Sequence, residues 1–134
     1  MRELNQAFYH VTHKVAEEHG TTRIQYLTLR KLKLHPMMRL SELAEQLRTN
    51  ASTASAVVDR LVHSGLIVRE TPSNDRRSVL LKLSAEGEEV LGRTDEALMK
   101  RLSPLLQLPE EEVEELIRIQ GKIISILQQL REES

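Results

Sequence analysis

The first part of the chain carries apolar residues at helical spacing. One stripe predicts a helix over about residues 2–18, and its members are Leu4, Phe8, Val11 and Val15. Gly20 is suited to end this helix in the left-handed conformation. Thr21 or Thr22 is suited to cap a second helix over about residues 22–34. The pattern therefore predicts two successive helices at the start of the chain.

Two shorter helices are predicted next. Ser41 is a good N-cap for a short helix with one apolar face, and residues 48–50 then break the periodicity. Thr49 or Asn50 can cap a following helix over about residues 51–63, which Gly65 ends. The apolar face of this helix has the i, i+3, i+4, i+7 spacing and consists of Ala54, Val57, Val58 and Leu61.

The period of the pattern then changes from helical to alternating. Residues 66–70 and 78–83 read as two strands, and the polar residues 71–75 between them have turn chemistry. We expect a β-hairpin with a long polar tip. Residues 38–40, before the pair of short helices, read as a short extended connector.

Two further helices end the chain. Ser84 is placed to cap a helix over about residues 85–103, before Pro104, and Pro109 to open the last helix as a first-turn proline. The last helix carries a wide apolar stripe: Val113, Leu116, Ile117, Ile123, Ile124, Leu127 and Leu130. Positions 113, 116, 120, 123, 127 and 130 alternate by three and four residues, with Gln120 as the one polar member, as in coiled coils. This favours pairing with a second copy over burial within one subunit.

Composition bounds the class of protein. With 134 residues, 40% of them hydrophobic and 29% charged, the chain suits one globular domain over residues 1–134. The absence of cysteine excludes disulfides, thiolate metal sites and thiol-based redox sensing. There is neither a membrane-length apolar run nor an apolar signal segment. We expect no membrane association and a cytoplasmic protein.

Charge is divided unevenly along the chain. The net charge is −1, but residues 1–83 hold 13 Lys and Arg against 8 Asp and Glu, whereas residues 84–134 hold 6 against 12. Such a division is compatible with a nucleic-acid-facing first half.

Two short helices followed by a hairpin predict a winged helix-turn-helix, so the expected fold is mainly α with a small β-hairpin wing. The second helix of such a pair enters the major groove of DNA. Its polar face here is rich in small and hydroxylic side chains, which allow close approach to base edges: Ser52, Thr53, Ser55, Ala56, Asp59 and Arg60. The alternative is a solvated surface helix that is rich in serine and threonine.

The polar tip of the hairpin contains Asp75, Arg76 and Arg77. Arginine at a projecting tip suits the negative potential of a narrow minor groove. Asp75 is close enough in sequence to hold one arginine in place. The alternative is a solubilising turn with one local ion pair, worth at most about 1 kcal/mol at an exposed site.

Residues 40–87 resemble the MarR family of bacterial regulators. The matching segments read LSELAEQL (40–47), STAS (52–55), VDRL (58–61), GLIVR (65–69), DRR (75–77) and LSAEG (83–87). Ser84 stands where the family usually has threonine. The resemblance implies a homodimer with helical dimerisation regions from both termini, residues 1–20 and 103–134, around a DNA-binding part at 36–84. It also implies that Arg77 enters the minor groove and that Asp75 positions the wing.

These considerations give one set of expected DNA contacts. The set is Ser41, Asn50, Ser52, Thr53, Ser55, Ala56, Arg60, Asp75, Arg76 and Arg77. A two-fold dimer would present two recognition helices about 34–36 Å apart, which predicts a near-palindromic operator on double-stranded DNA.

The family resemblance also implies a pocket for a small phenolic or aromatic effector that weakens DNA binding. The candidate lining residues are Phe8, Tyr9, His13, Tyr26 and Arg30. Alternatively, these side chains belong to the dimer core or to the surface.

Other function classes find little support. His10, His13 and Glu17 share a helix face, but a zinc site needs about four ligands, so we predict no metal. The sequence lacks a P-loop, a nucleotide-binding glycine pattern and a nucleophile elbow, and we predict neither a cofactor nor an enzyme. The expected function is a sequence-specific DNA-binding transcriptional regulator, a dimeric repressor released by an effector. The alternative is a helical protein–protein interaction module that does not bind DNA.

Overall fold

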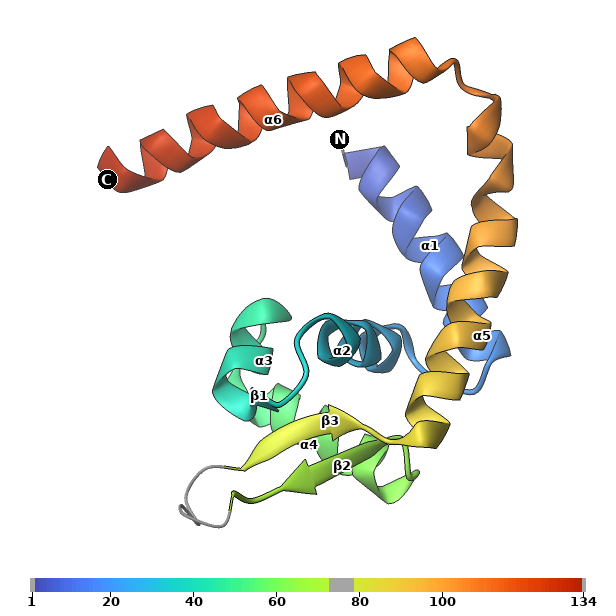
Figure 1. Ribbon diagram of the computed structural model, residues 1–134. Coiled ribbons are helices and arrows are strands. Elements are labelled where there is room, and N and C mark those ends of the chain that lie inside the picture. Colours follow the sequence, from blue (N-terminus) through green and yellow to red (C-terminus); the bar gives the residue numbers. More distant parts are fainter. Residues whose placement is uncertain (1, 73–78, 134) are drawn as a thin grey trace. The chain divides into compact units, whose positions relative to one another are not determined.

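The computed structural model describes residues 2–72 and 79–133 and is mostly helical, with one small antiparallel sheet (Figure 1). The chain divides into two compact units, Met1–Lys100 and Arg101–Ser134, which are described separately below. The predicted fold class, mainly α with a small β wing, is confirmed. Among the described residues, no helix has the length and apolar character to span a membrane.

The first two helices begin and end where their capping residues predict. Helix α1 (Arg2–Glu18) is followed by Gly20, which has a φ of 84° in the left-handed region. Helix α2 (Arg23–Leu34) starts with a capping box. The Gln25 amide donates to Thr22 Oγ1 at 3.2 Å, and the Thr22 amide donates to Gln25 Oε1 at 3.0 Å.

The helix pair α3 (Leu40–Gln46) and α4 (Ala51–His63) also follows its sequence signals, with one exception. Asn50 caps α4, because its Oδ1 accepts a hydrogen bond of 2.7 Å from the Thr53 amide. Ser41 does not cap α3, so that prediction is wrong: the helix begins at Leu40 and its N-cap is Arg39, without a side-chain cap. Arg39 is the last residue of a paired strand, so the chain passes directly from the sheet into the helix.

The sheet has three strands rather than the two of a simple hairpin. Strands β1 (Met38–Arg39), β2 (Ile67–Glu70) and β3 (Leu80–Leu83) are antiparallel in the order β1-β3-β2. The predicted extended connector is thus β1, which pairs Met38 with Leu81. Strand β2 begins one residue later than predicted, and the predicted start of β3 at residue 78 lies outside the described residues.

The core of unit 1 lies between the helices and the inner face of the sheet. Aliphatic side chains fill most of it, as the composition predicts. Tyr26 is the one aromatic member of this buried set: Ala16, Tyr26, Leu29, Leu32, Met38, Leu43, Val57, Val58, Leu61, Ile67, Leu81 and Leu91. The contribution of α4 to this core is its apolar face, so the polar face of the same helix is left toward solvent.

Helix α5 (Ala85–Leu102) is joined to the sheet by a tight corner at Ser84. Ser84 Oγ accepts a hydrogen bond of 2.9 Å from the Gly87 amide, which confirms Ser84 as the cap. The same hydroxyl donates to the Gly65 carbonyl at 2.5 Å. One side chain therefore fixes the start of α5 against the turn that follows α4.

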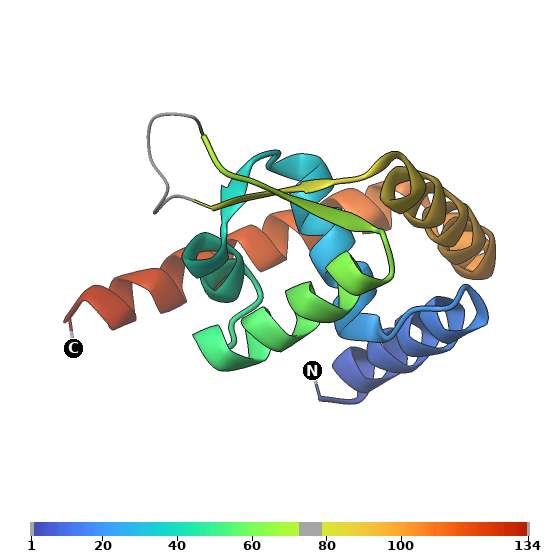
Figure 2. The same ribbon diagram turned by 90° about the horizontal axis from the view of Figure 1, so that it is seen from below.

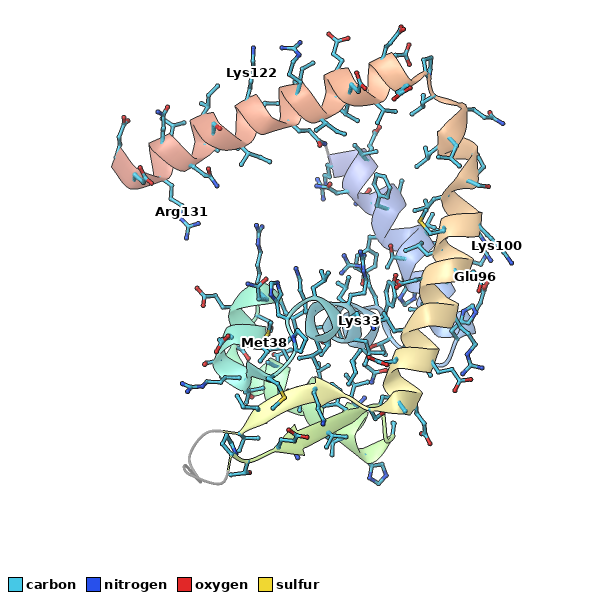
Figure 3. All side chains as sticks on the ribbon, in the orientation of Figure 1. Lys33, Met38, Glu96, Lys100, Lys122 and Arg131 are labelled. Carbon is cyan, nitrogen blue, oxygen red and sulfur yellow. The ribbon has the colours of Figure 1, made fainter. Side chains whose placement is uncertain are left out.

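Unit 2 contains a 3₁₀ turn, η1 (Ser103–Gln107), and helix α6 (Glu110–Glu133). Pro104 lies inside η1, where the first turn tolerates a proline. Pro109 precedes α6 instead of lying in its first turn, so the helix begins one residue later than predicted, and the Pro109 carbonyl accepts from the Glu112 amide at 3.0 Å. Figure 3 shows Lys122 and Arg131 projecting from different sides of α6.

Candidate nucleic-acid interface

Helix α4 presents its predicted polar face to solvent. Figure 2 shows α4, in green, on the near side of unit 1 in the view from below, with no other element of unit 1 in front of it. The exposed members of this face are Ser52, Thr53, Ala56, Asp59 and Arg60. Ser55 is half-buried. Because Ala54, Val57, Val58 and Leu61 anchor the opposite face in the core, the polar side chains are held on a rigid support.

A cleft of about 410 Å³ runs beside this face, between the start of α2 and α4. Four of the predicted DNA contacts line it, namely Ser52, Thr53, Ala56 and Arg60. The other lining residues are Thr22, Ile24, Gln25 and Val57. Local sequence patterns do not connect the start of α2 with α4, because only tertiary packing brings these distant segments together.

The two remaining predicted contacts of the helix pair have different settings. Ser41 is exposed in the first turn of α3 and is not among the residues that line the cleft. Asn50 is exposed, and its side-chain oxygen accepts the hydrogen bond from the Thr53 amide in the first turn of α4. Asn50 therefore has a structural role as the N-cap of α4.

Two ion pairs connect α4 to the hairpin and the hairpin strands to each other. Asp59 of α4 pairs with Arg69 of β2 through Oδ1 and Nη2. Glu70 of β2 pairs with Lys82 of β3. The sequence carries no local signal for these pairs, since no spacing rule relates a helix residue to a strand residue ten positions later.

The predicted tip of the wing lies outside the described residues. Asp75, Arg76 and Arg77 all fall in the segment 73–78. The strands that lead to and from this segment, β2 and β3, are described, and their register pairs Glu70 with Leu80.

The predicted effector-pocket residues fall into two groups. Tyr26 is buried, and its hydroxyl donates a hydrogen bond of 2.5 Å to Asp95 of α5. Burial, together with this hydrogen bond, raises the pKa of Tyr26 above its ordinary value. The Arg30 guanidinium lies 5.8 Å from the centre of the Tyr26 ring.

The second group lies on the exposed face of α1. Tyr9 stacks on His13 with ring centres 6.0 Å apart, and the Arg23 guanidinium lies 4.4 Å from the Tyr9 ring centre. His13 Nε2 is 3.2 Å from Glu17 Oε1. Phe8, like Tyr9, is exposed. In the part of the chain that the structure describes, no three His, Cys, Asp or Glu side chains are arranged to hold a metal ion.

Helices α3 and α4, followed directly by the β2–β3 hairpin of a three-stranded sheet, define a winged helix-turn-helix protein. The MarR family model matches residues 21–79, which include all of α2, β1, α3, α4 and β2. The HTH-type transcriptional repressor MdtR of Bacillus subtilis is 38% identical over 112 residues, which cover 80% of this chain and 70% of that protein. The chain belongs to the MarR family of DNA-binding transcriptional regulators.

Solved structures support the fold. One MarR family transcription regulator aligns over 100% of this chain and 89% of its own, with a TM-score of 0.91 at 21% identity. A mutant of Staphylococcus aureus MepR, solved bound to an oligodeoxyribonucleotide, aligns over 94% of each chain with a TM-score of 0.69 at 23% identity. The predictions of a DNA-binding transcriptional regulator that is not an enzyme are confirmed.

Proposed function

We propose that this regulator is a repressor that binds a near-palindromic operator as a homodimer and blocks transcription from the promoter. The observation that carries the proposal is the exposed polar face of α4, with its small hydroxyl side chains. Residues 36–84 form the DNA-binding part in this proposal, and α4 lies in the major groove. A regulator of this kind acts on bacterial DNA in the cytoplasm.

The residues of α4 have separate roles in this proposal. Ser52, Thr53, Ser55 and Ala56 approach base edges, since short side chains let the helix enter the groove deeply. Arg60, one turn further along, contacts a phosphate or a guanine. Ser41, Asn50 and the wing residues Asp75, Arg76 and Arg77 complete the proposed interface. Support for repression comes from MdtR, which is named as a transcriptional repressor.

The homodimer uses residues 1–20 and 103–134. Its support is the exposure of large apolar side chains on both segments. On α1 these are Leu4, Phe8 and Tyr9, and on α6 they are Val113, Leu116, Ile117, Ile119, Ile123, Ile124, Ile126, Leu127 and Leu130. A two-fold axis would place the two α4 helices about 34–36 Å apart, one turn of B-DNA.

The effector belongs to the same proposal. A small phenolic or aromatic compound would bind among Phe8, Tyr9, His13, Tyr26 and Arg30 and weaken DNA affinity. In support, an arginine guanidinium lies over each of the two tyrosine rings, so aromatic and cationic groups are already side by side.

The test is selection of genomic DNA fragments by the purified protein, beside an Arg76→Ala, Arg77→Ala double variant. We expect the wild type to recover a near-palindromic site and the double variant to lose it while staying dimeric. A Ser55→Leu variant should shift the base preference at the positions nearest α4. If the wild type recovers no fragment above background, the chain is instead a helical protein-interaction module.

A further inference from the structure

The junction between α4 and β2 holds an arginine that the proposed interface does not yet use. Arg69 of β2 forms an ion pair with Asp59, on the outward face of α4. Both side chains remain accessible, with 43% of the Arg69 side chain and 61% of the Asp59 side chain exposed. The guanidinium group is therefore oriented by a neighbour without being enclosed.

The position of this pair follows from the sheet register. Arg69 pairs with Leu81, which is buried, so both residues lie on the sheet face that packs toward the helices. Arg69 lies two residues beyond buried Ile67 on that face, where the hairpin leaves the core. Its guanidinium consequently emerges beside α4, between the helix and the outer part of the hairpin.

With α4 and the wing bound to DNA as proposed above, the geometry of duplex DNA determines what lies at the junction between α4 and β2. A helix in the major groove and a wing in the adjacent minor groove must be separated by one sugar–phosphate backbone. That backbone has to cross the junction between α4 and β2. The only charged pair that joins α4 to β2 among the described residues is Asp59 with Arg69.

We propose that Arg69 binds a phosphodiester group of the strand that separates the two grooves, and that Asp59 is the positioning residue for its guanidinium. Guanidinium has five N–H donors, so one carboxylate leaves donors for a phosphate. Pairing also neutralises Asp59, whose charge would otherwise repel the same phosphate. Glu70 does not compete for Arg69, because it pairs with Lys82 on the other sheet face.

The test is the salt dependence of affinity for the selected operator duplex and for a duplex of random sequence. Arg69→Gln should weaken binding to both duplexes about tenfold and reduce the slope of log K against log salt by about one. The Asp59→Asn, Arg69→Gln double variant decides the mechanism. It should recover only the part of the loss that comes from repulsion by unpaired Asp59 and should stay weaker than the wild type, because the phosphate contact is still absent. If Arg69 only neutralises Asp59, the double variant recovers wild-type affinity and slope, which overturns the proposal.

The positioning role of Asp59 has its own readout. Asp59→Asn keeps the charge of Arg69, so the salt slope should stay at the wild-type value while affinity for both duplexes falls several-fold. Asp59→Glu should restore affinity. Wild-type or tighter binding by Asp59→Asn would overturn the positioning role.

A matched control is Arg93→Gln on α5. Arg93 is also an exposed arginine in an ion pair, with Glu89 at 3.8 Å, and it lies on another helix. This variant should keep the wild-type slope, and thermal melting should show that all variants are folded. If the wild type binds neither duplex, the proposed function itself fails. If the wild type binds and Arg69→Gln behaves identically, only the phosphate site is wrong.

Discussion

At the residue scale, Tyr26 connects α2 to α5. Its ring is packed among the core aliphatic residues, and its hydroxyl donates a hydrogen bond to the Asp95 carboxylate. A buried hydroxyl needs a partner, because an unpaired polar group in the core is costly. Asp95 thus lets an aromatic side chain fill the core without leaving a polar atom unsatisfied.

Removal of this hydroxyl should destabilise the fold. Hydrogen bonds to charged groups contribute about 1.5–3 kcal/mol, so Tyr26→Phe should lower the free energy of unfolding by about that amount. Urea denaturation measures the change. Tyr9→Phe is the control, since Tyr9 is exposed and should alter the free energy of unfolding by less than about 0.5 kcal/mol. Equal effects of the two substitutions would contradict this account.

The raised pKa of Tyr26 gives a prediction for alkaline solution. In the unfolded chain this phenol ionises near pH 10, whereas in the folded protein it keeps its proton to higher pH. The folded state then binds more protons than the unfolded state, so stability falls as the pH rises above about 10. The stability difference between the wild type and Tyr26→Phe should therefore narrow above about pH 10 in urea denaturation. A difference that stays constant up to pH 11 would be evidence against it.

At the scale of elements, the packing of α5 against the end of α4 depends on a glycine. A Cβ atom at Gly87 would lie 2.1 Å from the Leu66 carbonyl oxygen, which is backbone and has little freedom to move. The Ser84 cap holds the two segments at this distance. The close approach at Gly87 and the Ser84 cap together hold the start of α5 against the turn that follows α4.

The two glycines of α5 should respond to alanine in opposite ways. Gly87→Ala should destabilise the protein by about 2 kcal/mol or more, because the first turn must move away from Leu66. Gly92→Ala should stabilise it by about 0.5–1 kcal/mol, since nothing lies within 4 Å of its Cβ position and alanine favours the helix. Thermal melting of the two variants measures both signs. Similar melting temperatures would contradict the close approach at Gly87.

Asn50 is the N-cap of α4, the helix whose polar face belongs to the candidate nucleic-acid interface. Asn50→Ala removes the acceptor for the Thr53 amide and should lower the free energy of unfolding by about 1 kcal/mol. Asn50→Asp retains an acceptor and should keep most of the stability. Chemical denaturation of the two variants is the check, and equal losses would show that the acceptor for the Thr53 amide does not account for the stability.

At the scale of the whole molecule, α6 is the helix whose large apolar side chains are exposed and not packed into a core. None of its residues is buried, although its stripe includes isoleucine and leucine throughout its length. A monomer rarely exposes so much contiguous apolar surface. The coiled-coil spacing of the stripe points to a second copy of this chain as its partner.

A charge on that stripe should separate the proposed dimer. Burial of one leucine contributes about 1.5–3 kcal/mol, and a two-fold interface contains the residue twice. Leu127→Glu should therefore raise the dimer dissociation constant by at least about 100-fold and weaken operator binding in parallel. Sedimentation velocity measures the dissociation. Lys122→Glu, off the apolar stripe, is the matched control and should remain dimeric (Figure 3). A dimeric Leu127→Glu variant would move the interface elsewhere.

The local signals of the sequence located most elements to within a residue or two. Capping residues and left-handed glycines act over a few positions, so Thr22, Asn50, Gly65 and Ser84 marked helix ends that the structure confirms. The error at Ser41 occurred where a distant segment decides. Ser41 is not a cap because pairing of β1 with β3 fixes the residues before α3.

The sequence by itself determined the helix–helix–hairpin order, the polar face of α4 and the family, because each is encoded in local periodicity or in a contiguous motif. Tertiary structure alone decided that β1 joins the sheet, that the start of α2 borders α4, and that Asp59 meets Arg69. Each of these depends on contacts between segments separated along the chain. Such contacts follow from the packing of the common core, and no single stretch of sequence specifies them.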